Sequence, residues 1–194
     1  MESGRNPAEG DSFLEVGLSI STLRLFALIT LMKHWYAVYT KSRHEKVAAE
    51  ELCHRGIEVF LPLRNVVSKW KDRRKEVQFP LFPGYLFTHV NLREKRLDIL
   101  KVPAVVRIVG FNEEPEPIPE EQIQAVKTLV FSKLPYDPFP ELVEGDRVRI
   151  RRGPLRGLVG YLVEKRNRYR FVIQIDLIRQ AVACEIDAAD VEKI

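Results

Sequence analysis

The sequence contains little cysteine. Its two cysteines among 194 residues, Cys53 and Cys184, lie far apart in the chain, and such a pair does not make the disulfide framework of a small secreted domain. A reducing compartment, the cytoplasm, fits better. Cys53 is followed by His54, with His44 nearby, but a metal site needs more ligands at better spacing. We therefore expect no metal site, and we predict that Cys53 is a buried thiol on a helix.

The sequence also lacks a long hydrophobic run that is free of charge. Its most apolar stretch, residues 13–32, contains Glu15 and Arg24, whereas a membrane-spanning helix needs about 20 residues with few charges. Acidic rather than basic residues precede this stretch, which does not suit a signal peptide. We expect no membrane association. Because Met32 stands directly before the first convincing strand, we hypothesise that it is the true start and that residues 1–31 are upstream sequence or a disordered tail. The N-terminal extension that precedes the first domain is residues 1–33, expected to be disordered or not native.

Neither sign of charge dominates, and catalytic motifs are missing. Lys and Arg number 31 and Asp and Glu number 27, which gives a net charge of +4. This balance permits contact with nucleic acid without requiring it. The sequence has no nucleophile elbow, no Walker loop and no dinucleotide-binding fingerprint, and its four histidines have no convincing nucleophile partner. We therefore expect a protein that is not an enzyme and that needs no cofactor.

The N-terminal part alternates strands and helices. Residues 35–40 are rich in aromatic and β-favouring residues and predict a strand. Ser42 stands three residues before Glu45, the spacing of a capping box, which predicts a helix that runs to about Arg55. A second strand is expected over residues 57–63.

A basic hairpin is expected next. The polar segment 68–76 contains five cations and lies between two strand-like runs, which predicts an exposed hairpin tip. Further along, Asn91 and Glu94 again have capping-box spacing and predict a short helix. A strand over residues 105–109 and an acidic, proline-rich loop over residues 113–119 are expected to follow.

These elements and a third helix complete the pattern β-α-β-β-α-β-α over residues 35–132. The pattern predicts an α+β sandwich in which helices cover one antiparallel sheet. Three prolines in residues 133–142 predict a stiff, extended linker. From residue 143 to residue 194, turn residues recur between short alternating runs. This pattern predicts a small β-barrel, near the lower size limit for a domain that folds alone.

Two motifs, in this order, resemble one protein family. The phrase Leu81-Phe82-Pro83-Gly84-Tyr85-Leu86-Phe87 resembles the signature of the NusG N-terminal (NGN) domain. A second set of residues resembles a KOW motif: Gly145, Asp146, Val148, Gly153, Pro154, Gly157 and Gly160. The resemblance implies an NGN α/β sandwich over residues 34–132 and a KOW β-barrel over residues 143–194. Residues 42–46 and 58–63 further resemble the specialised UpxY branch, which is related to RfaH and acts at particular operons.

The resemblance implies a function and a first set of site residues. NusG-like proteins are transcription elongation and antitermination factors that bind RNA polymerase and modulate pausing and termination. The residues carried over to the polymerase-binding patch, which grips the clamp helices of the largest subunit, are Phe82, Pro83, Gly84, Tyr85 and Phe87. Because neighbouring residues on a strand point to opposite faces, some of these aromatic side chains must belong to the core.

Two basic segments are candidates for nucleic-acid binding. Lys41, Arg43 and His44 lie where the first strand meets the first helix. A helix start favours anions, and in RfaH-like relatives this surface contacts the non-template DNA strand. The second segment is the hairpin tip, whose candidate residues are Lys69, Trp70, Lys71, Arg73 and Arg74. The indole of Trp70 could stack on a base, although charge runs are also common on surfaces that only meet solvent.

The predicted barrel is also basic, and nascent RNA or a ribosomal protein is an expected partner. In the housekeeping factor, a Phe-Gly-Arg loop helps to bind Rho and a ribosomal protein. This chain has Ile178, Arg179 and Gln180 in that region, a departure that puts both contacts in doubt. Because KOW motifs also occur in ribosomal proteins, an RNA-binding or ribosome-associated KOW protein is the alternative function. A cytoplasmic monomer is expected in either case.

Overall fold

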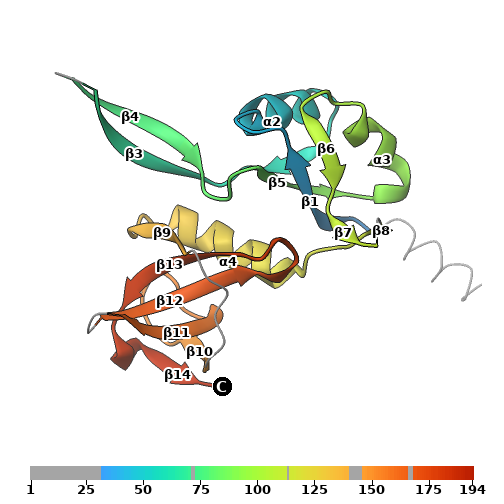
Figure 1. The fold of residues 1–194 in the computed structure, drawn as a ribbon. Coiled ribbons are helices and arrows are strands. Elements are labelled where there is room, and N and C mark those ends of the chain that lie inside the picture. Colours follow the sequence, from blue (N-terminus) through green and yellow to red (C-terminus); the bar gives the residue numbers. More distant parts are fainter. Residues whose placement is uncertain (1–31, 71–72, 113, 140–145, 166–167) are drawn as a thin grey trace, which may run out of the picture. The chain divides into compact units, whose positions relative to one another are not determined.

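The computed structural model describes residues 32–70, 73–112, 114–139, 146–165 and 168–194 (Figure 1). The predicted N-terminal extension therefore lies almost entirely outside the described residues. Side chains are described over the same ranges except at residues 67–75 and 165.

A four-stranded antiparallel sheet forms the centre of the N-terminal part (Figure 1). Its order is β2-β5-β1-β6, and the strands are β1 (His34–Thr40), β2 (Glu58–Phe60), β5 (Tyr85–Val90) and β6 (Val105–Ile108). Side chains alternate along β1, so that Trp35 and Ala37 join one buried cluster while Tyr36 and Val38 join the other. The central strand is therefore buried on both faces.

Helices cover the two faces of this sheet. Helices α2 (Glu45–His54) and α3 (Leu92–Leu100) bury Leu52 and Ile99 in the cluster that contains Tyr36. Helix α4 (Glu120–Phe131) buries Ile123, Val126 and Leu129 in the cluster that contains Trp35. The predicted α+β sandwich is confirmed.

The two predicted capping boxes have different outcomes. The Asn91 side chain accepts a hydrogen bond from the Arg93 N–H (3.1 Å) and donates one to Glu94 (3.0 Å), so the cap of α3 is confirmed. The capping box at Ser42 is wrong. Helix α2 has His44 at its N-cap, without a side-chain cap, and the carboxylate of Glu45 accepts a hydrogen bond from a distant backbone N–H, that of Gly84.

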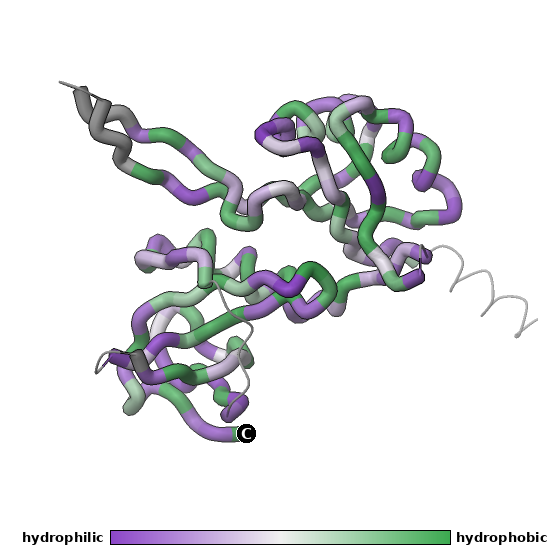
Figure 2. Tube along the Cα trace, viewed as in Figure 1, coloured by the Kyte–Doolittle hydropathy of each residue, from purple (hydrophilic) through white to green (hydrophobic). Residues whose placement is uncertain are grey.

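The basic hairpin is confirmed and is longer than expected. Strands β3 (Leu63–Trp70) and β4 (Arg73–Pro80) pair from Leu63 opposite Pro80 to Trp70 opposite Arg73 (Figure 1). Figure 2 shows hydrophilic and hydrophobic residues alternating along this two-stranded ribbon. The predicted strand over residues 57–63 is shorter than expected, because β2 ends at Phe60 and Leu63 already belongs to the hairpin.

Residues 113–119 are not simply a loop. Strand β8 (Glu114–Pro115) pairs with β7 (Gly110–Phe111), and Ile118 forms a single bridge with Trp35. Residue 113 lies outside the described part.

The C-terminal part is a six-stranded antiparallel sheet of order β14-β10-β11-β12-β13-β9, which confirms the predicted strand-rich fold. Its strands are β9 (Tyr136–Phe139), β10 (Arg147–Ile150), β11 (Val159–Lys165), β12 (Arg168–Ile175), β13 (Gln180–Ile186) and β14 (Val191–Lys193). Two short 3-10 helices, η1 (Asp176–Ile178) and η2 (Ala188–Asp190), lie on either side of β13. Residues Tyr136–Phe139 of the predicted linker are extended and pair with β13 as an edge strand, while residues 140–142 lie outside the described part.

The turn between η1 and β13 contains a strained residue. Arg179 has φ 51°, in the left-handed region, where an L-residue pays about 1–2 kcal/mol. We expect Arg179→Gly to raise the free energy of unfolding by roughly 1 kcal/mol, since the greater freedom of glycine in the unfolded chain offsets part of the gain. Urea denaturation of the full chain measures the change. Arg152→Gly is the matched control, because Arg152 has no positive φ, and it should lower stability. An equal change in both variants would contradict the prediction.

Candidate functional site

The sheet face that packs against α4 carries three rows of side chains, each crossing neighbouring strands. The rows are Glu58-His89-Trp35, Phe60-Phe87-Ala37 and Tyr85-Tyr39-Arg107. Helix α4 covers the first two rows, since the Lys127 Nζ lies 4.1 Å from the Trp35 ring centre and 5.4 Å from that of Phe60. In the third row, Tyr39 is 37% exposed.

The third row forms an exposed aromatic surface, which we call the tyrosine surface: Tyr39, Tyr85 and Arg107. The two tyrosine rings lie 5.2 Å apart between centres and are tilted by 48°. The Arg107 guanidinium lies 5.8 Å from the centre of the Tyr39 ring, within the range of a cation-π contact. Aromatic rings beside an arginine are the groups that most often dominate a protein interface.

Hydrogen bonds of Gly84 hold the backbone next to this surface. Its N–H donates a hydrogen bond to the Glu45 Oε1 (2.8 Å), and its carbonyl accepts hydrogen bonds from the Thr40 N–H (2.8 Å) and the Thr40 Oγ1 (3.3 Å). Glu45 and Thr40 are both buried. Gly84 has φ +83°, and a Cβ at this position would lie 3.1 Å from the Cε2 of Tyr39. The backbone beside Tyr85 is therefore held at both of its polar groups, and the space for a side chain is taken by Tyr39.

The residues predicted for polymerase binding divide into two groups. Phe82 and Phe87 are 1% and 0% exposed, and their rings meet edge to face at 5.8 Å. They support the surface from the core, and replacing either with alanine would cost about 3–5 kcal/mol of stability. Pro83 is exposed and Tyr85 is half-buried, so these two can touch a partner.

The sequence analysis missed three residues of this site: Tyr39, Glu45 and Arg107. Alternation along the first strand from Trp35 would have placed Tyr39 on the same face. The local pattern at Glu45 predicted a helix cap and not this contact, and no local pattern marks Arg107, because both residues act through partners far away in sequence.

The basic residues predicted at the start of the first helix are all exposed. Lys41, Arg43 and His44 occupy the connection between β1 and α2. The Lys41 N–H donates to the Ala104 carbonyl (2.9 Å), and the His44 Nδ1 lies 2.8 Å from the Ser42 carbonyl oxygen. Because Thr40 and Glu45 flank this connection and both bind Gly84, the backbone of these three residues passes beside the tyrosine surface.

The hairpin candidates are located by their backbone. Lys69 and Trp70 end β3, and Arg73 and Arg74 begin β4. Lys71 lies outside the described residues.

The KOW-motif residues have structural roles. Val148 is buried, Gly153 and Gly157 have positive φ, Pro154 is exposed, and Asp146 pairs with Lys193 at 2.6 Å. A Cβ at Gly160 would lie 2.5 Å from the Val172 carbonyl oxygen, so this position needs glycine for close approach of two strands. Gly145 lies outside the described residues.

Many cations of the C-terminal sheet are paired. Arg149 and Arg151 both lie near Glu192 (3.6 and 3.9 Å), while Arg168 pairs with Glu185 (2.8 Å) and Arg170 pairs with Asp137 (3.0 Å). These surface pairs contribute little to stability, but they reduce the net positive charge that the sheet offers to RNA.

The cysteines differ in exposure. Cys53 is exposed, so the prediction of a buried thiol there is wrong. Cys184 is buried, and this burial raises the pKa of its thiol to about 11, which keeps it protonated and unreactive near neutral pH. Within the described residues, no group of three or more His, Cys, Asp or Glu is placed to hold a metal ion, and no helix is long and apolar enough to cross a membrane.

Comparison with known proteins finds similarity to NusG proteins in sequence and in fold. A family model described as transcription termination factor NusG matches residues 33–127. The transcription termination/antitermination protein NusG of Lactococcus lactis is 25% identical over 183 residues, which cover 86% of this chain and 96% of the relative. The protein of the same description from Helicobacter pylori strain J99 is 28% identical over 176 residues, covering 84% and 99%.

The chain is a NusG-like protein. A solved structure of Thermotoga maritima NusG, 24% identical, covers 84% of this chain and 97% of its own with a TM-score of 0.50. It supports the same fold, an NGN domain followed by a KOW domain. The resemblance to the NusG family is confirmed, while membership of the UpxY or RfaH-type branch stays a prediction.

The Glu45 contact predicts a graded effect on stability. Glu45→Ala leaves the Gly84 N–H without its acceptor, and we expect it to lower the free energy of unfolding by on the order of 1–3 kcal/mol. Glu45→Gln keeps an acceptor oxygen and should lose less. Urea denaturation measures both variants. Glu50→Ala, an exposed glutamate of the same helix, should change stability least, and an Ala variant at Glu45 no worse than this control would refute the role of Glu45.

Proposed function

We propose that the chain is a non-enzymatic transcription elongation and antitermination factor that binds bacterial RNA polymerase and modulates pausing and termination. The similarity to NusG proteins and the names of the relatives support this role. The observation that carries it is the tyrosine surface, where the cover over the sheet ends and Tyr39 and Tyr85 meet solvent beside Arg107.

The tyrosine surface suits an apolar, partly acidic partner. In NusG-like proteins this region grips the clamp helices of the largest polymerase subunit. Two rings supply apolar area, and Arg107 supplies a charge for an acidic residue on the partner. The hydrogen bonds of Gly84 hold the rings in place before binding, which lowers the entropy lost on association. A factor bound there and across the cleft keeps the clamp closed, which disfavours pausing.

The non-template DNA strand is the proposed second ligand. Lys41, Arg43 and His44 are exposed beside the tyrosine surface, so a factor seated on the polymerase would present them to nucleic acid at the same time. Phosphate contacts of this kind give affinity without sequence preference.

The KOW domain, joined by the proline-rich segment, would bring a further partner at high local concentration. This partner is nascent RNA or a ribosomal protein, and the pairing of four arginines with carboxylates lowers the positive charge available to RNA. We further propose that the protein is a cytoplasmic monomer and a specialised paralogue of the UpxY or RfaH type, which acts at particular operons.

Polymerase binding is the first test. We expect the double variant Tyr39→Ala, Tyr85→Ala to bind a reconstituted bacterial elongation complex at least about tenfold more weakly than the wild type, because buried aromatic anchors carry much of an interface's binding energy. Fluorescence anisotropy with a labelled factor measures the affinity. Phe82 is not a suitable target for this test, because its ring is buried and removing it would lower the stability of the fold.

A matched control comes from the KOW domain. Tyr169 is 38% exposed, close to the value for Tyr39, and Tyr169→Ala should bind as the wild type does. Undiminished binding by the double variant would overturn the assignment of the tyrosine surface. Binding to ribosomes or RNA in the absence of any binding to polymerase would favour an RNA-binding or ribosome-associated KOW protein.

A further inference from the structure

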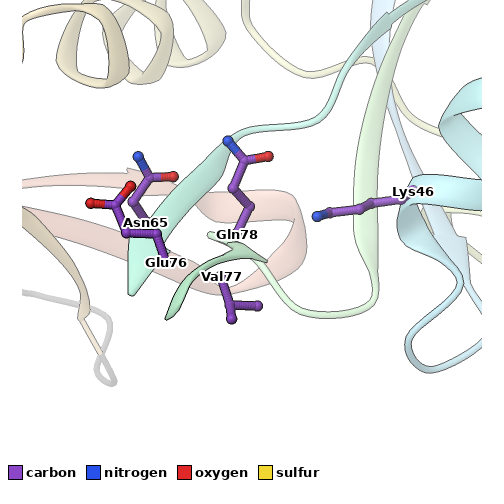
Figure 3. A pocket seen from close by; sticks show the side chains of 5 residues that line it. All are labelled: Lys46, Asn65, Glu76, Val77 and Gln78. Carbon is purple, nitrogen blue, oxygen red and sulfur yellow. The ribbon is translucent and has the colours of Figure 1, made fainter. Parts of the chain in front are cut away.

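An open hollow lies between helix α2 and the β3–β4 hairpin. Its volume is about 460 Å³, and it is lined by Lys46, Asn65, Glu76, Val77 and Gln78. Figure 3 shows Lys46 extending from α2 toward the hairpin, with Asn65, Glu76 and Gln78 on one side of the ribbon and Val77 on the other. The hollow is therefore built from two elements, one with a cation and one with amides and a carboxylate.

The two amides of the hollow form a pair. Asn65 and Gln78 stand directly opposite each other in the antiparallel register of the hairpin, which places their Cβ atoms about 4.5–5.5 Å apart. Both side chains are exposed, and within the described residues neither makes a side-chain hydrogen bond. Each amide offers a donor and an acceptor side by side, the pattern that Asn and Gln use to contact the N6 and N7 atoms of adenine.

Basic segments lie in sequence beside both walls of the hollow. Lys41 and Arg43 precede the first turn of α2, which carries Lys46, and the hairpin continues from Asn65 into the five cations of residues 69–75. A chain of phosphates is attracted to such an arrangement along its length. A base inside a duplex shows N6 and N7 only within the major groove and remains stacked, whereas an unstacked base of a single strand can turn into a hollow.

We propose that this hollow binds an unpaired adenine of single-stranded DNA, with Asn65 and Gln78 contacting the base edge and Lys46 contacting a phosphate. This inference rests on the proposed function and deepens it, because the non-template strand is the single-stranded DNA that a polymerase-bound factor meets. Lys41, Arg43 and His44 then supply affinity, and the amide pair supplies a preference for one base.

Anisotropy with labelled oligonucleotides at a fixed salt concentration tests the site. The probes are a short strand of thymines and the same strand with adenines at its centre. The full-length wild-type protein should bind the adenine strand about tenfold more tightly. The double variant Asn65→Ala, Gln78→Ala should lose this preference while binding the thymine strand unchanged. Lys46→Ala should weaken both strands by the same factor, as expected for a phosphate contact.

Controls separate this inference from the proposed function. Gln124→Ala, an exposed glutamine of α4, should leave the adenine preference intact. The double amide variant should bind as the wild type does to an elongation complex whose unpaired non-template strand contains no adenine, because the tyrosine surface is unchanged. A wild type without adenine preference, a preference that survives in the double variant, or tighter binding of the matching RNA strand would each overturn the site. If the wild type did not bind polymerase at all, the proposed function would be rejected instead.

Discussion

Burial of β1 on both faces is the constraint on which the NGN domain depends. Trp35 and Ala37 pack toward α4, while Tyr36 and Val38 pack toward α2 and α3. A single strand thus joins two cores. On the face that packs against α4, Tyr39 is exposed to solvent. Its row of side chains forms the tyrosine surface, which we propose binds polymerase. The binding surface is therefore the row of side chains that follows two packed rows on the same sheet face. The sheet and its core fix the positions of these side chains.

Local contacts could be predicted from the sequence, and distant ones could not. Asn91 caps α3, the helix that starts beside it, and its spacing to Glu94 predicts this cap. Ser42 and Glu45 show the same spacing, but Glu45 binds an N–H that lies 39 residues away. The tertiary fold brings Glu45 to Gly84, and the local spacing of Ser42 and Glu45 does not predict this contact. Strand β9 was hidden for the same reason, since its partner β13 lies beyond three further strands.

The signature around Phe82 includes Tyr85 of the tyrosine surface, but the sequence could not separate its core residues from its surface residues. Phe82 and Tyr85 are both aromatic, and only the positions of α4 and Gly84 make the first a core residue and the second a surface residue. Charge shows a similar limit. The arginines of the C-terminal part suggest a nucleic-acid surface in sequence, yet four of them face carboxylates on β9, β13 or β14.

Strand β9 also determines where the C-terminal sheet stops. It covers the outer edge of β13, and Pro138, opposite Val182, has no N–H to offer a further strand. Open edges of this kind recruit other chains and lead to aggregation, and proline at an edge is one of the ways in which proteins prevent it. The segment that joins the two domains thus also covers the edge of the C-terminal sheet. A fragment that begins at residue 143 would lack β9 and would expose the unpaired backbone of β13.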